Sequence, residues 1–359
     1  MLRSGILHGT TFQKILVSGA LACCLTTQVN AGVVLLYHHV AEGTPPITSI
    51  APDQFSRHLD IIEAEGFTVL PLDELVKRSM DPSNGSDKSD EKIVAITFDD
   101  AYRSIYISAF PILQAGGWPF TIFVATRLIE EKNPHYLTWA QLAEMSAHGA
   151  TIANHTDSHI HMIRRLDAET ADNWKQRMKE ELLTAKGLLV KHGLDSNLFA
   201  YPYGEYDEAT LNLVGDLGMI GFGQQSGAIG PHSNPLLLPR YPLAGIYAGE
   251  AAFRDKLRSL PFPIEHPKVE PLVLDNLKPP LELSFITDTL NLSRLTCYGP
   301  GGLMALSETS STNILATPAE AVSIGRTRYN CTLPRGNRFY WFSQLWIRKR
   351  NDGSWYHEP

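Results

Sequence analysis

The chain has 359 residues, of which 43% are hydrophobic and 19% charged, and its formal net charge is −7. This apolar fraction excludes a disordered chain, and the length corresponds to two domains or to one large domain with an extension. Acidic residues outnumber basic ones, 38 to 31, and no basic run reaches five residues, which argues against nucleic-acid binding.

The first 31 residues have the pattern of a secretory signal peptide. Arg3 and Lys14 precede an apolar run over residues 15–25, and the small-residue segment 29–31 (VNA) offers a cleavage site. The run is shorter than the roughly 20 residues that span a bilayer, and no later stretch is apolar enough to do so. We therefore predict cleavage after Ala31 and a periplasmic or secreted protein. The alternative is an N-terminal core helix.

Between residues 32 and 260, short apolar runs alternate with helical patterns. Such strand–helix repeats predict a parallel sheet covered by helices, and about seven of them favour a distorted (β/α) barrel over an open sheet. Strands are predicted at 33–37, 93–98, 119–125, 150–153, 198–201, 219–222 and 236–238. Helices are predicted at 54–64 and 168–192, after the capping-box residue Thr138, and from Asp207 to about residue 218.

The C-terminal part has a different texture. Prolines concentrate in 261–280, which predicts a linker, and residues 281–359 predict a small all-β domain with strands at 281–287, 301–306, 329–333 and 339–348. Cys297 and Cys331 are the cysteines that remain after signal removal. In an oxidising compartment they predict one disulfide, worth about 2–4 kcal/mol, with two buried free thiols as the alternative.

Five polar clusters each follow one of the predicted strands of the 32–260 domain. In a β/α barrel the carboxyl ends of the strands face the active site, whereas chance would scatter polar clusters over both ends. The coincidence therefore predicts a single catalytic face. The clusters are YHHV at 37–40, TFDD at 97–100, HTDSH at 155–159, AYPYGE at 200–205 and LPRYP at 238–242.

Two of these clusters carry metal-ligand chemistry. His155 and His159 have the i, i+4 spacing that lets two imidazoles share one ion, and the adjacent carboxylates Asp99 and Asp100 are costly unless they face a cation or share a proton. Two imidazoles and one carboxylate leave water positions open on Zn²⁺ or a similar ion, an arrangement that serves metal-assisted hydrolysis. Taken separately, the clusters could also be a helix-capping acidic loop and a surface histidine pair.

The other three clusters offer supporting roles. Gly204 lets a ligand approach closely, and the backbone N–H of Tyr203 could stabilise an oxyanion. Either His38 or His39 could act as a general acid. Arg240 could hold a carboxylate in its charged form. The corresponding structural alternatives are a plain Pro–Gly turn, a buried hydrogen-bonded histidine and a surface ion pair.

Over residues 32–260 the chain resembles the polysaccharide deacetylases, the NodB-homology carbohydrate esterases. TFDD and HTDSH together are highly specific for this family, and YPYG at 201–204 is supportive. The resemblance implies that Asp100, His155 and His159 bind the metal. It also implies that Asp99 is the general base and that the Tyr203 amide helps form the oxyanion hole.

The sequence departs from the usual family pattern at two places. Ala200 stands where the third motif usually begins with Arg, and the late Leu-x-His that supplies the general acid is not found. The arrangement is closer to the branch of the poly-β-1,6-N-acetylglucosamine deacetylases, where a Tyr/Phe-His motif near the N-terminus supplies the acid. This branch implies that His38 is the acid, and we infer that Arg240 replaces the missing Arg.

The predicted function is a metal-dependent hydrolase that removes N-acetyl groups from an N-acetylglucosamine-containing polysaccharide, with one divalent ion, best fitted by Zn²⁺. Poly-N-acetylglucosamine, chitooligosaccharide and peptidoglycan remain open as substrates. A glycosidase built on Asp99 and Asp100 fits poorly, because adjacent residues seldom flank a glycosidic bond from both sides. A second alternative is a catalytically decayed carbohydrate-binding or assembly protein of the cell envelope.

Overall fold

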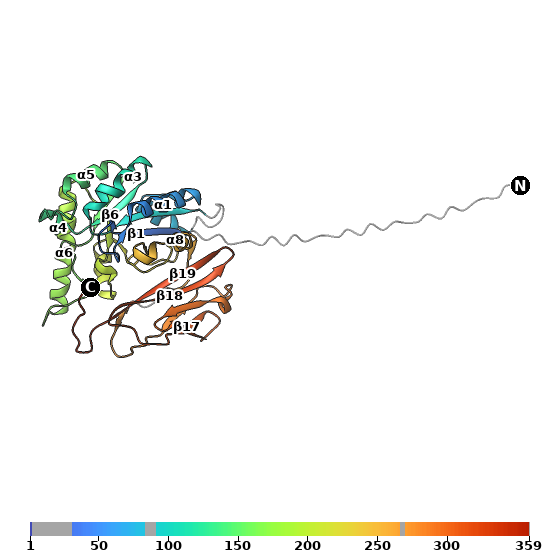
Figure 1. Cartoon of the computed structure of the whole chain (residues 1–359). Helices are drawn as coiled ribbons and strands as arrows, with labels where there is room; N and C mark the ends of the chain where they lie inside the picture. Colours follow the sequence, from blue (N-terminus) through green and yellow to red (C-terminus); the bar gives the residue numbers. More distant parts are fainter. Residues whose placement is uncertain (2–30, 83–90, 266–269, 359) are drawn as a thin grey trace.

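The computed structural model describes residue 1 and residues 31–82, 91–265 and 270–358. The predicted signal peptide therefore lies almost entirely outside the described residues. Among the helices in these ranges, none combines the length and the apolar composition that crossing a lipid bilayer would take. A barrel-like α/β part lies above a set of β-sheets in Figure 1.

Seven parallel strands form a half-barrel and confirm the predicted fold class. Their order is β10-β1-β5-β6-β7-β8-β9, and the short strand β4 pairs beside β5. All six residues of β1 are buried, as are those of β5. Helices cover the sheet, so these strands are apolar on both faces instead of alternating. The strands are β1 (Gly32–Tyr37), β4 (Thr68–Val69), β5 (Ile93–Phe98), β6 (Phe120–Val124), β7 (Ala150–Asn154), β8 (Leu198–Ala200), β9 (Ile220–Phe222) and β10 (Tyr241–Pro242).

The gap between β9 and β10 is closed by one irregular segment. Leu238 forms an isolated parallel bridge with Phe222, and Tyr241 pairs with Leu35 of β1. The predicted strand at 236–238 is thus reduced to this bridge, because prolines on either side of it lack the N–H that a ladder needs. The closing segment carries Arg240 across the mouth of the half-barrel.

Local signals explain several helix boundaries. Helix α1 begins with Pro52 in its first turn, and Gly66 follows its end with a φ of +74°. Thr138 and Asp207 each form a complete capping box at the start of α5 and α7. The helices are α1 (Pro52–Ala64), α2 (Leu72–Met80), α3 (Phe110–Ala115), α4 (Thr126–Glu130), α5 (Trp139–Ala147), α6 (Ala171–Lys191), α7 (Glu208–Asp216) and α8 (Glu250–Leu257), with short helical turns at Ile105–Ala109, Pro202–Gly204, Gly245–Ala248 and Leu292–Arg294.

The C-terminal β region, residues 259–358 where described, contains two sheets. One has the order β11-β19-β18-β14-β15 with β12 beside β19, and the other has the order β13-β17-β16. The predicted linker at 261–280 holds β12 and the end of β11, both paired with β19, so it is not a free connection. The strands are β11 (Ser259–Pro261), β12 (Leu272–Val273), β13 (Leu281–Ser284), β14 (Thr296–Gly299), β15 (Gly302–Leu303), β16 (Ala305–Glu308), β17 (Asn313–Thr317), β18 (Gly325–Arg335) and β19 (Arg338–Arg348).

The predicted disulfide is confirmed. Cys297 of β14 and Cys331 of β18 are direct neighbours across the two strands, and their sulfurs are bonded. Both residues are fully buried. The bond therefore closes a loop within the β region and does not connect this region to the barrel.

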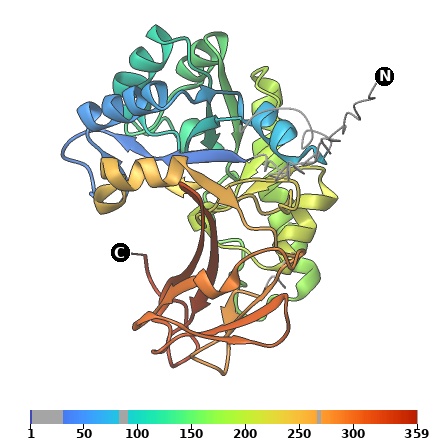
Figure 2. The ribbon, with the colours of Figure 1, turned by 90° about the vertical axis from the view of Figure 1, so that its right-hand side faces the viewer.

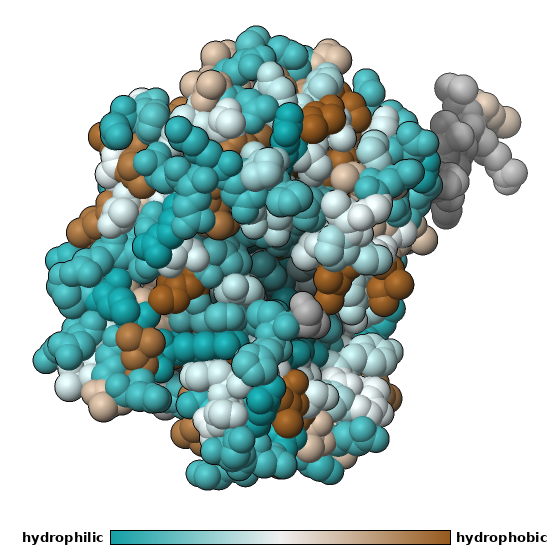
Figure 3. Space-filling view, turned by 60° about the vertical axis from the view of Figure 1, so that its left-hand side comes forward, coloured by the Kyte–Doolittle hydropathy of each residue, from teal (hydrophilic) through white to brown (hydrophobic). Residues whose placement is uncertain are grey.

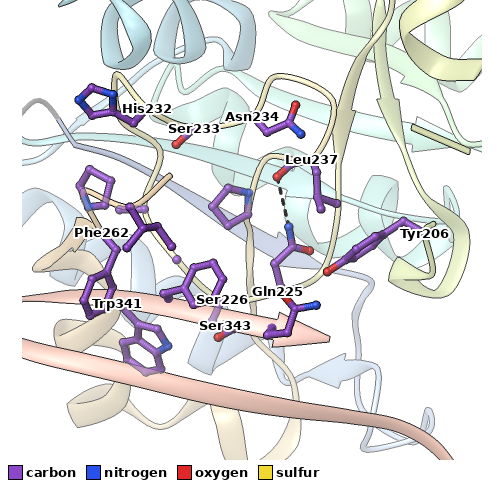
Figure 4. A pocket seen from close by; sticks show the side chains of 17 residues that line it. Tyr206, Gln225, Ser226, His232, Ser233, Asn234, Leu237, Phe262, Trp341 and Ser343 are labelled. Carbon is purple, nitrogen blue, oxygen red and sulfur yellow. Dashed lines mark hydrogen bonds between the residues drawn. The ribbon is translucent and has the colours of Figure 1, made fainter. Parts of the chain in front are cut away.

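The barrel and the β region share a continuous apolar core. Leu345 and Ile347 of β19 belong to the same buried cluster as Phe199 and Tyr201 of the barrel. Figure 2 shows the long hairpin strands extending from the barrel into the β region. A cavity of about 100 Å³ remains at the junction, with Tyr206, Gln225, Phe262, Trp341 and Ser343 among its lining side chains (Figure 4).

Candidate active site and metal centre

The three predicted metal ligands meet at the carboxyl ends of β5 and β7. Asp100 follows β5, while His155 and His159 follow β7. The Nε2 atoms of His155 and His159 lie 3.3 Å and 3.0 Å from one carboxylate oxygen, Oδ1 of Asp100. The parallel sheet thus places at one edge three side chains that are distant in sequence. None of them lines the junction cavity of Figure 4.

Two of these residues adopt a left-handed backbone conformation. The φ angle is +68° at Asp100 and +56° at His159. For a residue with a side chain this conformation costs roughly 1–2 kcal/mol, and it persists where the surrounding structure holds it in place. The turns after β5 and β7 are therefore shaped to direct side chains inward, as expected of a functional site.

The atoms of this cluster fit a cation. His155 Nδ1 lies 2.7 Å from the carbonyl oxygen of Ala200, which can only accept, so Nδ1 carries the hydrogen and Nε2 of the neutral ring presents a lone pair. Oδ1 of Asp100 is buried and has no hydrogen-bond partner among the described residues. Two lone-pair atoms that face each other in a buried place repel each other unless a metal ion or a proton lies between them. The set could hold a divalent ion such as Zn²⁺.

Asp99 points to a different partner, Arg240. Both side chains are fully buried, and the guanidinium donates two parallel hydrogen bonds to the carboxylate at 2.7 Å and 2.8 Å. Arg240 also donates to the carbonyl of Gly223 and to the hydroxyl of Thr97. Burial, the largest single effect, raises the pKa of Asp99, but the charge and hydrogen bonds of Arg240 together with the charges of His155 and His38 outweigh it and leave the pKa below its ordinary value. Asp99 is therefore a carboxylate at neutral pH.

The two candidate acids in YHHV have different surroundings. Burial lowers the pKa of His38, although the nearby charges of Asp100 and Asp99 oppose that shift. His39 instead stacks on Tyr102, with ring centroids 3.6 Å apart, and burial lowers its pKa to about 4. The charge of Asp100 acts on the pKa of both histidines, and that of Asp99 acts on the pKa of His38 as well, which favours His38 over His39 as the group near the reacting atoms.

The YPYG segment forms a tight turn beside the ligand cluster. Tyr203 has a φ of +60°, and its ring meets that of His159 edge to face at 4.5 Å. Gly204 has a φ of +65°, and a Cβ there would lie 2.7 Å from the Cβ of Gln224. Only glycine fits at Gly204, and the turn brings the Tyr203 ring against His159.

Residues 86–221 match the family model described as Polysaccharide deacetylase. Over this segment, which is less than half of the chain, the sequence is similar to that family. The Bacillus subtilis (strain 168) protein YxkH is 28% identical over 221 residues, which cover 61% of this chain and 73% of YxkH. The poly-beta-1,6-N-acetyl-D-glucosamine N-deacetylase of Staphylococcus aureus (strain MSSA476) is 26% identical over 201 residues, covering 54% of this chain and 67% of that protein.

Solved structures share the fold over 63% of this chain. IcaB from Ammonifex degensii superposes with a TM-score of 0.53 at 25% identity, over 63% of this chain and 97% of IcaB. The Streptococcus pyogenes deacetylase PplD, in complex with acetate, gives a TM-score of 0.55 at 24% identity, over 63% of this chain and 98% of PplD. More than a third of this chain thus lies outside each superposition.

The structure adds residues to the candidate site that sequence reasoning left without a role. Glu205, one position past the YPYG turn, is fully buried and accepts a hydrogen bond from His161. Tyr102 continues the stack on His39 towards Tyr136, whose ring centroid lies 5.1 Å away. Glu205 and Tyr102 flank the recognised motifs in sequence, which was the available signal, but their partners come from distant segments.

Proposed function

We infer that this chain is a metal-dependent deacetylase that removes N-acetyl groups from a polysaccharide containing N-acetylglucosamine. The observation that carries the proposal is the meeting of Asp100, His155 and His159 around one buried carboxylate oxygen, beside an ionised Asp99. The likeness to a poly-beta-1,6-N-acetyl-D-glucosamine N-deacetylase supports this substrate class.

Each residue of the site has a role in acetamide hydrolysis. A divalent ion held by the Asp–His–His set supplies Lewis-acid chemistry for the acetamide carbonyl and for water. Asp99, kept ionised by Arg240, accepts a proton from the attacking water. The Tyr203 amide donates to the developing oxyanion. His38 protonates the leaving amine, and its lowered pKa makes the protonated ring a stronger acid.

The surface of the molecule suits a carbohydrate. Figure 3 shows a hollow near the centre of one face, and most of the surface around it is hydrophilic. A glycosidase is disfavoured because Asp99 and Asp100 are adjacent residues, and adjacent residues seldom flank a glycosidic bond from both sides. The intact ligand geometry also argues against a decayed site.

We further propose that the protein works in the periplasm or outside the cell, with its first 31 residues removed as a signal peptide. The Cys297–Cys331 disulfide supports an oxidising compartment, because such bonds persist there and are rare in the cytosol. A polymeric substrate of the cell envelope would be reached in the same place.

The test is mass spectrometry of defined N-acetylglucosamine oligosaccharides after incubation with the purified protein, with and without a chelator. We expect mass losses of one acetyl group that the chelator suppresses and added Zn²⁺ restores. Asp99→Asn should abolish this activity while the bound metal is retained. Asp216→Asn, an exposed carboxylate in α7, is the matched control and should behave as wild type. Glycan binding without any acetyl loss in the metal-loaded wild type would favour the decayed-protein alternative.

A further inference from the structure

We propose that the C-terminal β region completes the active site, and that Arg326 and Tyr356 are positioning residues for the Tyr203 turn. This inference rests on the proposed deacetylase function, in which the turn supplies the oxyanion donor. It concerns a part of the molecule that lies outside the strand–helix motifs of residues 32–260.

Glu205 is the point where the two parts of the chain meet. Its carboxylate is fully buried directly after the turn. One oxygen accepts from His161 Nδ1 at 2.8 Å, a bond within the barrel. The other accepts from the Tyr356 hydroxyl and from Arg326 Nη1 at 3.2 Å, and both of these donors belong to the β region. Removing the β-region donors would leave a buried carboxylate only partly satisfied, which is costly.

A second carboxylate from the chain end fixes Arg326 in place. Both terminal nitrogens of Arg326 donate to Glu358, at 2.8 Å and 2.6 Å. Arg164 of the barrel donates to the Tyr356 carbonyl at 3.1 Å and lies over the Tyr356 ring. A bidentate pair of this kind restricts orientation as well as adding energy.

His161, Glu205 and Glu358 also bring ligand-type atoms within 4.8 Å of one another. A metal ion is disfavoured there because Arg326 reaches both carboxylates and Arg164 lies within 4 Å of both. Two guanidinium groups already balance the two carboxylates. The cluster is therefore a structural ion-pair network and not a second cation site.

The network reaches the turn through aromatic contacts. The His161 ring stacks flat on the Tyr203 ring, with centroids 3.7 Å apart and planes 7° from parallel. The Arg326 guanidinium carbon lies 5.6 Å from the centroid of the same ring. Because Tyr203 holds a left-handed backbone conformation, it needs such support from its surroundings. The contacts thus run from Arg326 and Tyr356 through Glu205 and His161 to Tyr203.

The packing of the β region makes this support rigid. Leu345, Ile347 and Tyr356 lie in one buried cluster with Tyr201, which begins the turn. An oxyanion donor must be held closely, since a displacement of about 1 Å can cost on the order of 100-fold in rate. Loss of the network should therefore lower kcat more than it raises KM.

The experiment compares Arg326→Met, Arg326→Lys and Tyr356→Phe in the full chain, with Arg350→Met as the control. Arg350 is an exposed arginine of the same C-terminal segment. We expect Arg326→Met to lower kcat by about 10–100-fold, with a KM change of less than about threefold and unchanged bound metal. Arg326→Lys should restore part of kcat, and Tyr356→Phe should show a smaller loss.

Hydrogen–deuterium exchange provides a readout that does not depend on turnover. Peptides covering residues 201–205 should exchange faster in Arg326→Met and Tyr356→Phe and be unchanged in Arg350→Met. If the wild type removes no acetyl group, the proposed function fails, whereas the exchange data still judge the positioning role. Unchanged exchange over 201–205 in both variants, with Arg326→Met as active as wild type, would overturn the inference. If Arg326→Met does not fold, Tyr356→Phe, which deletes one hydroxyl, decides.

Discussion

The buried Asp99–Arg240 pair offers a sharp test of the electrostatics of the site. Arg240→Met keeps an apolar side chain of similar length but leaves Asp99 without its cation. Both groups are fully buried, so the carboxylate would face the full cost of desolvation. Breaking a buried pair from one side costs about 3–5 kcal/mol, and we expect the free energy of unfolding to fall by that amount.

A double-mutant cycle separates the pair from its packing. Asp99→Asn alone leaves Arg240 buried and charged, whereas the double variant Asp99→Asn/Arg240→Met removes both charges. The loss in free energy of unfolding of the double variant should therefore be smaller than the sum of the losses of the two single variants, by at least about 2 kcal/mol. Arg57→Met is the matched control, because Arg57 and Glu250 form an ion pair at 3.1 Å with both side chains about half exposed. That loss should stay under about 1 kcal/mol.

The measurement is urea unfolding followed by circular dichroism at pH 7.5, with the metal content kept constant. Two results would refute the reasoning. One is a loss for Arg240→Met no greater than that for Arg57→Met. The other is a loss of stability in the double variant that equals the sum of the two single losses, which would mean that the two charges do not interact.

Three further predictions concern stability. Burial lowers the pKa of His58 to about 4, below the value near 6.5 of an unfolded chain, so the unfolded state binds the extra proton as the pH falls from 7 to 4. Between pH 7 and pH 4, the free energy of unfolding of the wild type should fall by up to about 3 kcal/mol more than that of His58→Gln, as measured by urea unfolding. Equal losses in the two proteins would contradict the lowered pKa of His58. Replacing Cys297 and Cys331 by Ala together should lower stability by about 2–4 kcal/mol, matched by reduction of the wild type. Gly221→Ala would place a Cβ 2.3 Å from the Leu236 carbonyl oxygen and should cost about 1–3 kcal/mol, whereas Gly187→Ala in α6, where the space is open, should not destabilise.

The sequence determined the elements that depend on local physics. Continuous apolar runs such as 93–98 specify buried parallel strands, because both of their faces are covered. Capping residues such as Thr138 and Asp207 specify where helices begin, because a side chain satisfies backbone N–H groups three residues away. The i, i+4 spacing of His155 and His159 indicated a shared ion, whereas the choice of Asp100 over Asp99 as the third ligand came from the family resemblance.

Other features depend on segments that meet only in the folded chain. The strand expected at 236–238 is reduced to a single bridge, because Pro235 and Pro239 on either side of it have no backbone N–H to donate to a strand ladder. The tertiary structure also decided that Arg240 faces Asp99 and that the proline-rich segment 261–280 pairs with β19. It decided as well that Glu205, the acidic residue after the YPYG turn, accepts hydrogen bonds from Arg326 and Tyr356 of the C-terminal β region. Local patterns fix a residue's own conformation and its near neighbours. The partner of a buried charge is set by which distant segments the core brings together, and no local pattern records that.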